Sequence, residues 1–162
     1  MKKILLALTT GLAFTAVQAA DYGIVDVEKV VQGSTYLKQQ QNTLQQSIKS
    51  QTTQIEQLQK DLAALQQKAQ TAKLTDAEKK KMSTDFEAKA TQLNSLQQQV
   101  QSKVQTTMQA TNTTFETRVK TAAEQVRKEN KLDVVLNKNS VLASDVSADL
   151  TDKIIQKVNA IK

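Results

Sequence analysis

The sequence is short of several residue types on which protein chemistry commonly depends. Its 162 residues include no cysteine, histidine, proline or tryptophan, and only three glycines. Without histidine and cysteine, the chain lacks the commonest general base, the thiol nucleophile and the usual zinc ligands. We therefore expect no enzymatic activity, no bound metal and no other cofactor.

The same composition favours long helices. Proline and glycine weaken helix interiors more than any other residues, and this chain has no proline and few glycines. Aromatic residues make up 3% of the chain, which is too few to dominate an ordinary globular core. With a length suited to one domain, the chain is predicted to be mainly α-helical.

The first residues have the pattern of a secretory signal peptide. Lys2 and Lys3 precede the apolar stretch 4–17, which runs into small residues up to Ala19. A membrane anchor is the alternative, but about 14 apolar residues are short for a bilayer. No cysteine follows that could carry a lipid. We predict cleavage after Ala19 and a soluble exported protein that begins at Ala20.

The glutamine-rich segment 37–58 could be either a disordered tract or a helix. Its apolar residues decide between the two, because they recur at alternating steps of four and three along one seam. The seam consists of Leu44, Ile48, Gln51, Ile55, Leu58, Leu62, Leu65, Ala69 and Ala72. A helix is therefore predicted from Leu37 to about Ala72, with glutamines diluting the seam near its start.

A second long helix should begin after a short turn. Thr75 followed by Glu78 is a capping-box pattern, and Asp76 in the first turn suits the helix dipole. The second seam consists of Met82, Phe86, Ala90, Leu93, Leu96 or Gln97, Val100, Val104, Met108, Thr111, Phe115, Val119, Ala122 and Val126. We interpret the methionines and phenylalanines of this seam as core packing rather than as contacts for a partner.

Two long helices joined by a short turn should fold back as an antiparallel hairpin. With the turn centred near 73–74, facing residues have numbers that add to roughly 147. Leu65 then faces Met82 and Leu44 faces Val104, so apolar residues meet along the seam. At about 1.5 Å per residue, the first helix would be about 54 Å long.

The remaining segments are predicted to form a small body. The run Ile24–Val27 is typical of a short strand, and a brief helix with Asp26 as its N-cap should follow and end at Gly33. Near the other end, Asp133–Leu136 and Val141–Ala143 are typical of a β-hairpin.

A final helix should complete the body. We expect Thr151 to cap this helix and one face of it to carry Leu150, Ile154, Val158 and Ile161. The predicted organisation is a signal peptide at 1–19, an oligomerisation body at 20–36 and 116–162, and a helical arm at 37–115. About 60 residues make a marginal core, and strands from several copies would cover each other's edges, so we expect an oligomer.

Several segments, in order, resemble the Skp/OmpH family of periplasmic chaperones. They are ADYGIVDVEKV, the helical hairpin, LDVVLNKNSVL and DLTDKIIQKV, and the likeness covers the whole mature chain. The resemblance implies a homotrimer with a β-barrel-like body and three arms that enclose a cavity. It also implies a periplasmic location and ATP-independent holding of unfolded outer-membrane proteins, which prevents their aggregation.

On this interpretation the trimer forms through short strands of the body. The residues expected there are Ile24, Val25, Val27, Val134, Val135, Leu136, Val141 and Leu142. The basic cluster that the family uses for lipopolysaccharide is not carried over, because Lys103 is the one basic residue between Gln101 and Phe115.

Charge is distributed unevenly between arm and body. The arm has ten lysines and six acidic residues, whereas the rest of the mature chain has ten basic and ten acidic residues. A basic arm would attract acidic clients and raise their encounter rate. The candidate client-binding residues are Lys49, Lys60, Lys68, Lys79, Lys80, Lys81, Lys89 and Lys103. Each lysine taken singly is more typical of a solvated helix surface than of a binding site, so the asymmetry between arm and body is the better support.

The sequence also bears on three other roles: a docking protein, membrane contact and nucleic-acid binding. A periplasmic structural or docking protein with a coiled-coil hairpin remains the alternative. The run Lys79–Lys81 fits transient contact with an anionic membrane surface, or a solvated helix start. A nucleic-acid partner is not expected, because the chain has a signal peptide and few aromatic residues that could stack on bases.

Overall fold

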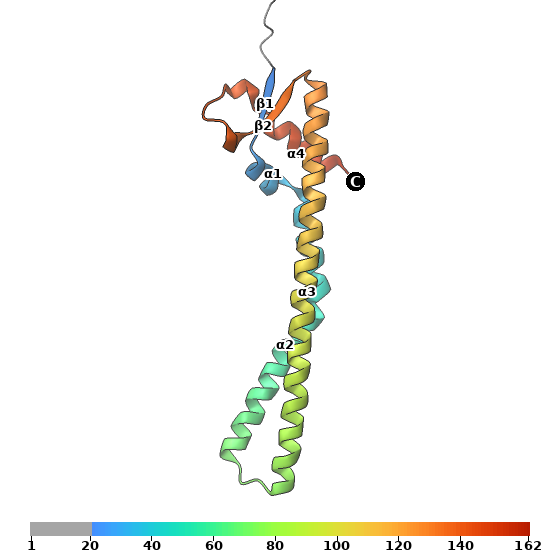
Figure 1. Ribbon diagram of the computed structural model, residues 1–162. Coiled ribbons are helices and arrows are strands. Elements are labelled where there is room, and N and C mark those ends of the chain that lie inside the picture. The colour runs from blue at the N-terminus through green and yellow to red at the C-terminus, as the bar shows by residue number, and fades with distance from the viewer. Residues whose placement is uncertain (1–20) are drawn as a thin grey trace, which may run out of the picture.

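The computed structural model describes residues 21–162, so the predicted signal peptide and its cleavage site lie outside the described residues. The molecule is elongated, with a small body at one end and a two-helix arm projecting from it (Figure 1). The elements, in order, are β1 (Tyr22–Val25), α1 (Val27–Gly33), α2 (Thr35–Thr71), α3 (Asp76–Glu129), β2 (Val134–Asn137), the 3₁₀ turns η1 (Lys138–Ser140) and η2 (Val146–Ala148), and α4 (Thr151–Ala160). A long helical hairpin on a small α+β body was predicted, and this architecture confirms it.

Helices α2 and α3 form the arm, and each begins at a side-chain cap. The Ser34 hydroxyl accepts a hydrogen bond from a backbone N–H in the first turn of α2, at 3.2 Å. At the start of α3, Thr75 Oγ1 accepts from the Glu78 N–H at 3.4 Å, while the Glu78 carboxylate accepts from the Thr75 N–H at 2.8 Å. The predicted capping box is confirmed. The 37 residues of α2 span about 55 Å.

The two arm helices contact each other along a thin seam. Among the residues of α2, Leu58 is the one buried side chain. Two polar contacts cross the hairpin: Lys89 Nζ donates to Asp61 Oδ2 at 2.6 Å, and Lys103 Nζ donates to the Ser47 carbonyl oxygen at 3.1 Å. The residue numbers of both pairs add to 150, which agrees closely with the predicted antiparallel register. Few fully packed side chains therefore hold the arm together.

Polar side chains fix the arm to the body. The Arg118 guanidinium lies 4.1 Å from the ring centroid of Tyr36 and donates to the Ile161 carbonyl oxygen at 2.5 Å. Asn159 donates to the Gly33 carbonyl oxygen at 3.0 Å and accepts from the first backbone N–H of α2 at 2.9 Å. The start of α2 and the last third of α3 are thus tied to the C-terminal segment that includes α4, which sets the direction of the arm.

The body contains a two-stranded parallel sheet. Tyr22 of β1 lies opposite Val134 of β2, and the pairing runs on to the last residues of both strands. On its other side, β1 receives a hydrogen bond at 2.7 Å from the Leu150 N–H to the Ile24 carbonyl oxygen. Within residues 21–162, β2 is therefore the edge of the sheet.

The predicted β-hairpin in the C-terminal part is wrong. Val134–Asn137 is a strand, close to the expected position, but Val141–Ala143 is not a strand. The Asn137 carboxamide oxygen accepts a hydrogen bond from the Asn139 N–H at 3.1 Å and starts the 3₁₀ turn η1. β2 pairs with β1 from the other end of the chain, and the chain after β2 turns into η1 instead of returning as a strand.

The first strand also lies two residues earlier than predicted, at Tyr22–Val25. Asp26 ends it, because its carboxylate accepts from the Lys29 N–H at 3.2 Å and so caps α1. Val27 is therefore the first residue of α1 rather than part of the strand. The brief helix up to Gly33 and its Asp26 cap are confirmed.

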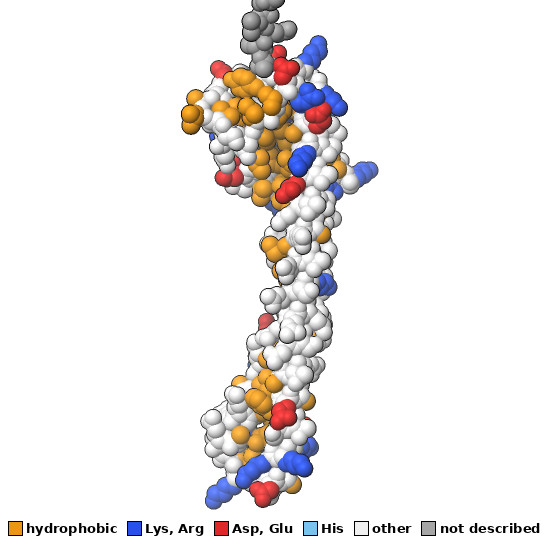
Figure 2. All heavy atoms as spheres, in the orientation of Figure 1, with side chains coloured by type: hydrophobic (Ala, Val, Ile, Leu, Met, Phe, Trp, Pro, Cys, Tyr) orange, Lys and Arg blue, Asp and Glu red, His pale blue; other side chains and the backbone are white. Residues whose placement is uncertain are grey.

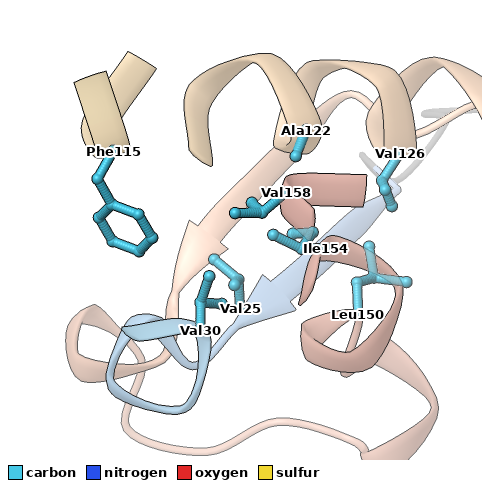
Figure 3. Packing of buried hydrophobic residues seen from close by; sticks show 8 residues of the cluster. All are labelled: Val25, Val30, Phe115, Ala122, Val126, Leu150, Ile154 and Val158. Atoms are coloured by element: carbon cyan, nitrogen blue, oxygen red, sulfur yellow. The ribbon is translucent and has the colours of Figure 1, made fainter. Parts of the chain in front are cut away.

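The core of the body lies where α4 packs between α3 and α1 (Figure 3). Apolar side chains from both ends of the chain meet there and point toward one another. The cluster consists of Val25, Val30, Phe115, Ala122, Val126, Leu150, Ile154 and Val158. Three of the four residues predicted to share one face of α4 belong to it, and Ile161 is half-buried.

Thr151 has a different role from the predicted cap. Its buried hydroxyl accepts a hydrogen bond from the Asp26 N–H at 2.9 Å, so it links the start of α4 to the end of β1. The N-cap position of α4 is Leu150, which makes no side-chain cap hydrogen bond. The Thr151 N–H is satisfied by the Asp149 carboxylate at 2.9 Å.

Gly23 allows a close approach inside the body. A Cβ atom at this position would lie 2.2 Å from Leu150 Cδ1 and 2.9 Å from Leu132 Cδ1. Real Cβ atoms are essentially never found at such distances, so with any larger residue here the two leucines or the strand would have to shift.

Candidate functional site

The described residues hold no group of His, Cys, Asp or Glu side chains that could bind a metal ion. In this same part of the chain, no helix has both the length and the apolar character needed to cross a bilayer.

The eight lysines predicted to bind clients are spread along the arm and form no single cluster. Lys49, Lys60 and Lys68 lie on α2, Lys79–Lys81 lie in the first turns of α3, and Lys89 and Lys103 lie further along α3. On the face in view, charged side chains gather on the body and at the end of the arm, and the middle is mostly uncharged (Figure 2).

Two of these lysines bond to the neighbouring arm helix. Lys89 is half-buried beside Asp61, and Lys103 donates to a backbone carbonyl of α2. Both therefore stabilise the hairpin, a role that spacing along the sequence did not indicate. The remaining six are exposed, and among them Lys79 lies 3.6 Å from the Asp76 carboxylate.

The arm divides into two parts of different charge. We call residues 37–55 and 90–115 the proximal arm, next to the body, and residues 56–89 the distal arm. The proximal arm has three lysines and no acidic residue, whereas the distal arm has seven lysines and six acidic residues. Most of the arm's excess positive charge therefore comes from Lys38, Lys49 and Lys103, and not from the run Lys79–Lys81.

Two carboxylates of the distal arm, Asp61 and Glu78, are favoured in their charged form by hydrogen bonds. The hydrogen bond from Lys89 and a second one from Gln57 lower the pKa of Asp61. The hydroxyl and the backbone N–H of Thr75 lower the pKa of Glu78. The lysines of the distal arm are thus balanced by nearby carboxylates at neutral pH.

Each part of the arm has an apolar cavity between its two helices. The proximal groove has a volume of about 460 Å³ and lies between the first turns of α2 and the middle of α3. It is lined by Leu37, Gln40, Gln41, Leu44, Gln45, Ile48, Val104, Thr107, Met108, Thr111 and Asn112. The distal cavity, of about 420 Å³, includes Leu65, Leu74, Met82 and Phe86 with Lys79 and Glu87.

The aromatic and sulfur-containing side chains of the second seam pack unequally. Phe115 is buried, and Met82 and Phe86 are half-buried, in agreement with core packing. Met108 is 55% exposed, so the prediction that it is a core residue is wrong. Thr111, a polar residue three positions after Met108 on the same seam, is the signal in the sequence that the two helices pack less tightly there.

The body also presents apolar side chains to solvent. They are Tyr22, Val31, Val134, Leu136, Leu142 and Val146, with Leu142 and Val146 almost fully exposed. Of the residues predicted to form a trimer, Ile24 and Val25 are buried inside the chain's own body, and Val27, Val135 and Val141 are half-buried. The predicted residues that reach the surface are Val134, Leu136 and Leu142.

Known proteins share this fold and parts of this sequence. The fold is that of a helical hairpin on a small mixed body. A crystal structure of a protein from Caulobacter crescentus CB15 has the same fold, and that protein is described as an OmpH-like outer membrane chaperone. The two align with a TM-score of 0.67 and 20% identity over 88% of this chain and 85% of the other. An uncharacterized protein of Aquifex aeolicus is 26% identical over 98% of this chain and 97% of its own length.

The sequence profile of the family described as "Outer membrane protein (OmpH-like)" matches residues 21–158. The match covers nearly all of the described chain, from β1 to the last turns of α4. The chain belongs to the OmpH-like family, as its segments suggested.

Proposed function

We propose that the protein is an ATP-independent chaperone of the periplasm that holds unfolded outer-membrane proteins and prevents their aggregation. In this proposal it acts as a homotrimer, and the three arms enclose the cavity in which a client is held. Membership of the OmpH-like family supports the proposal. The observation that carries it is the shape of the chain, a helical arm of about 55 Å on a small body that leaves a sheet edge open.

The body supports self-association. A two-stranded sheet is marginal on its own, and an open strand edge can pair with another chain. Beside this edge, Val134 and Leu136 are each 37% exposed, and Leu142 is fully exposed. Strands and apolar side chains of two further copies would cover this surface and leave the arms free.

The surface of the arm suits a holding function. Its exposed residues are mainly glutamine, threonine and serine, so a client would be confined without a large apolar surface to which it could adhere. The excess of lysine on the arm would attract acidic clients. Because Lys89 and Lys103 are engaged within the hairpin, this role falls mainly to the exposed lysines, with Lys49 of the acid-free proximal arm the first to test.

The test is suppression of aggregation without nucleotide. An outer-membrane protein diluted from urea should scatter much less light in the presence of about one trimer per client, with or without ATP. Sedimentation of the mature protein should show three chains. Undiminished scattering would overturn the chaperone proposal and favour a structural or docking hairpin instead.

Export is tested separately. Mass spectrometry of the protein from the periplasmic fraction should find Ala20 as the first residue, as cleavage after Ala19 requires. A retained N-terminus in the cytoplasmic fraction would contradict the proposed location.

A further inference from the structure

We propose that the proximal groove of a single arm binds an extended polypeptide segment in which apolar side chains alternate with uncharged or acidic ones. This inference rests on the proposed function and deepens it. It places part of the bound client between the two helices of one arm, next to the body, rather than only in the space between arms.

The floor of the groove accepts apolar side chains. Leu44 and Ile48 from α2 and Val104 from α3 are half-buried, so each leaves part of its surface open in the groove. Met108 is 55% exposed and stands at the same opening. A methionine side chain is flexible and polarizable, so it can adapt to apolar groups of different shape.

The rim of the groove can satisfy a peptide backbone. Gln41, Gln45 and Asn112 line it, and each carboxamide carries both hydrogen-bond donors and an acceptor. An extended chain offers one N–H and one carbonyl oxygen per residue, whatever its sequence. From Leu37 to Ile48 the groove follows α2 for about 17 Å, the length of about five residues of a strand.

Charge selects the type of segment. The groove lining includes no charged side chain, and the whole proximal arm has no carboxylate. Lys49 lies in an adjoining depression that shares Gln45 and Ile48 with the groove, and Lys103 lies in another that shares Thr107. A carboxylate on the bound segment would therefore meet Lys49, whereas a lysine on it would find no carboxylate among the residues that line the groove.

The distal cavity has similar size but different chemistry. It is lined by Lys79 and Glu87 in addition to apolar residues, so it presents both signs of charge. Gln66 also lines it, and lies three heptads after Gln45 on the same helix. The pair Gln45 and Gln66 therefore allows one substitution to be compared at equivalent positions of the two cavities.

The experiment measures peptide binding to the mature protein by fluorescence anisotropy. The probe is a labelled peptide of about ten residues, long enough to exceed the groove, that alternates valine with threonine and carries two glutamates. A second peptide carries two lysines instead. The variants are Gln45→Glu, Met108→Gln and the control Gln66→Glu, each checked for helix content and melting temperature.

We expect the wild type to bind the glutamate peptide more tightly than the lysine peptide. Gln45→Glu and Met108→Gln should each weaken binding of the glutamate peptide by about tenfold, because one adds a like charge and the other removes apolar contact. Gln66→Glu should change the affinity by no more than about twofold, because Gln66 lines the distal cavity and does not contact a peptide bound in the proximal groove.

Equal loss in Gln45→Glu and Gln66→Glu, or equal binding of the two peptides, would overturn the inference. A change in sedimentation mass of Met108→Gln would also overturn it, because the groove would then be covered by a second copy of the chain. If the wild type suppresses client aggregation while the groove variants bind peptide normally, the chaperone proposal stands and this inference alone fails. If the wild type suppresses no aggregation, the chaperone proposal fails.

Discussion

Lys89 on α3 donates to Asp61 on α2 at 2.6 Å, one helical turn from Leu58, the buried side chain of α2. Their side chains are 35% and 32% exposed, so the pair is partly shielded from water. Beyond it toward the tip, the helices leave the distal cavity between them. The ion pair therefore marks the end of the closed part of the seam.

Removal of this pair should loosen the distal arm. Lys89→Met is expected to lower the melting temperature by a few degrees and to speed proteolytic cleavage within residues 62–88. Lys60→Met removes an exposed lysine of the same arm and is the control. Identical cleavage rates in the two variants would show that the ion pair does not hold the distal helices together.

Glu124 should contribute to stability in a pH-dependent way. Two hydrogen bonds from Arg127, at 2.8 and 2.9 Å, lower the pKa of Glu124 to about 2. Because the folded pKa lies below the unfolded value of about 4.3, the contribution is fully present above that pH and is lost as pH falls through about 2. Glu124→Gln should therefore lower the melting temperature at pH 7 and match the wild type near pH 2.

Glu116→Gln provides the control for this titration, since Glu116 is an exposed glutamate about two turns earlier on the same helix. A constant difference between Glu124→Gln and the wild type from pH 7 to pH 2 would contradict the proposed linkage.

Gly23→Ala should destabilise the body. Its Cβ would lie 2.2 Å from Leu150 Cδ1, so the leucine or the strand must shift, at a cost of about 1–3 kcal/mol in free energy of unfolding. Gly33→Ala should be milder, because its nearest neighbour is Ile155 at 3.1 Å. Urea denaturation measures both. The double variant Gly23→Ala, Leu150→Ala should lose less stability than the two single variants combined, and strict additivity would exclude the steric cause.

Charge on the exposed apolar surface of the body should block self-association. Leu142→Glu or Leu136→Lys places a charge where the proposed trimer needs apolar contact, so sedimentation should show a lower mass at micromolar concentration. Ala64→Glu, an exposed change on the arm, should leave the mass unaltered. An unchanged mass in both body variants would place the subunit contact elsewhere.

Features specified by neighbouring residues could be predicted from the sequence. The Thr75–Glu78 capping box and the Asp26 cap each involve residues three positions apart, so the signal and its partner appear together. The hairpin seam follows in the same way from a repeat of apolar residues. One feature of the candidate site is also readable from the sequence, since the proximal arm contains no acidic residue. Charge counted over the whole arm hides this, because the six acidic residues of the distal arm are included.

Features that depend on distant partners could not be predicted. The Thr151 hydroxyl bonds to the backbone of Asp26, 125 positions away, and no local pattern indicates that choice over a helix cap. Val141–Ala143 has the composition of a strand, but β2 pairs with β1, which is more than 100 positions away in the sequence, and Val141–Ala143 pairs with neither strand. Exposure of Met108 depends on how far the two helices separate, which a periodic pattern does not specify.

The parallel pairing of β1 with β2 also has a consequence for the order of folding. Tyr22 and Val134 are 112 positions apart in sequence, so closing the sheet directly from an unfolded chain is entropically costly. The hairpin turn, by contrast, needs contacts between near neighbours only. If the helical hairpin forms first at the turn and then extends toward the body, it brings the two strands together before they pair. Thr75→Ala, which removes the capping box, should therefore slow refolding in stopped-flow experiments more than it speeds unfolding, and the reverse result would mean that the body forms first. The arm would then be the template on which its own base is assembled.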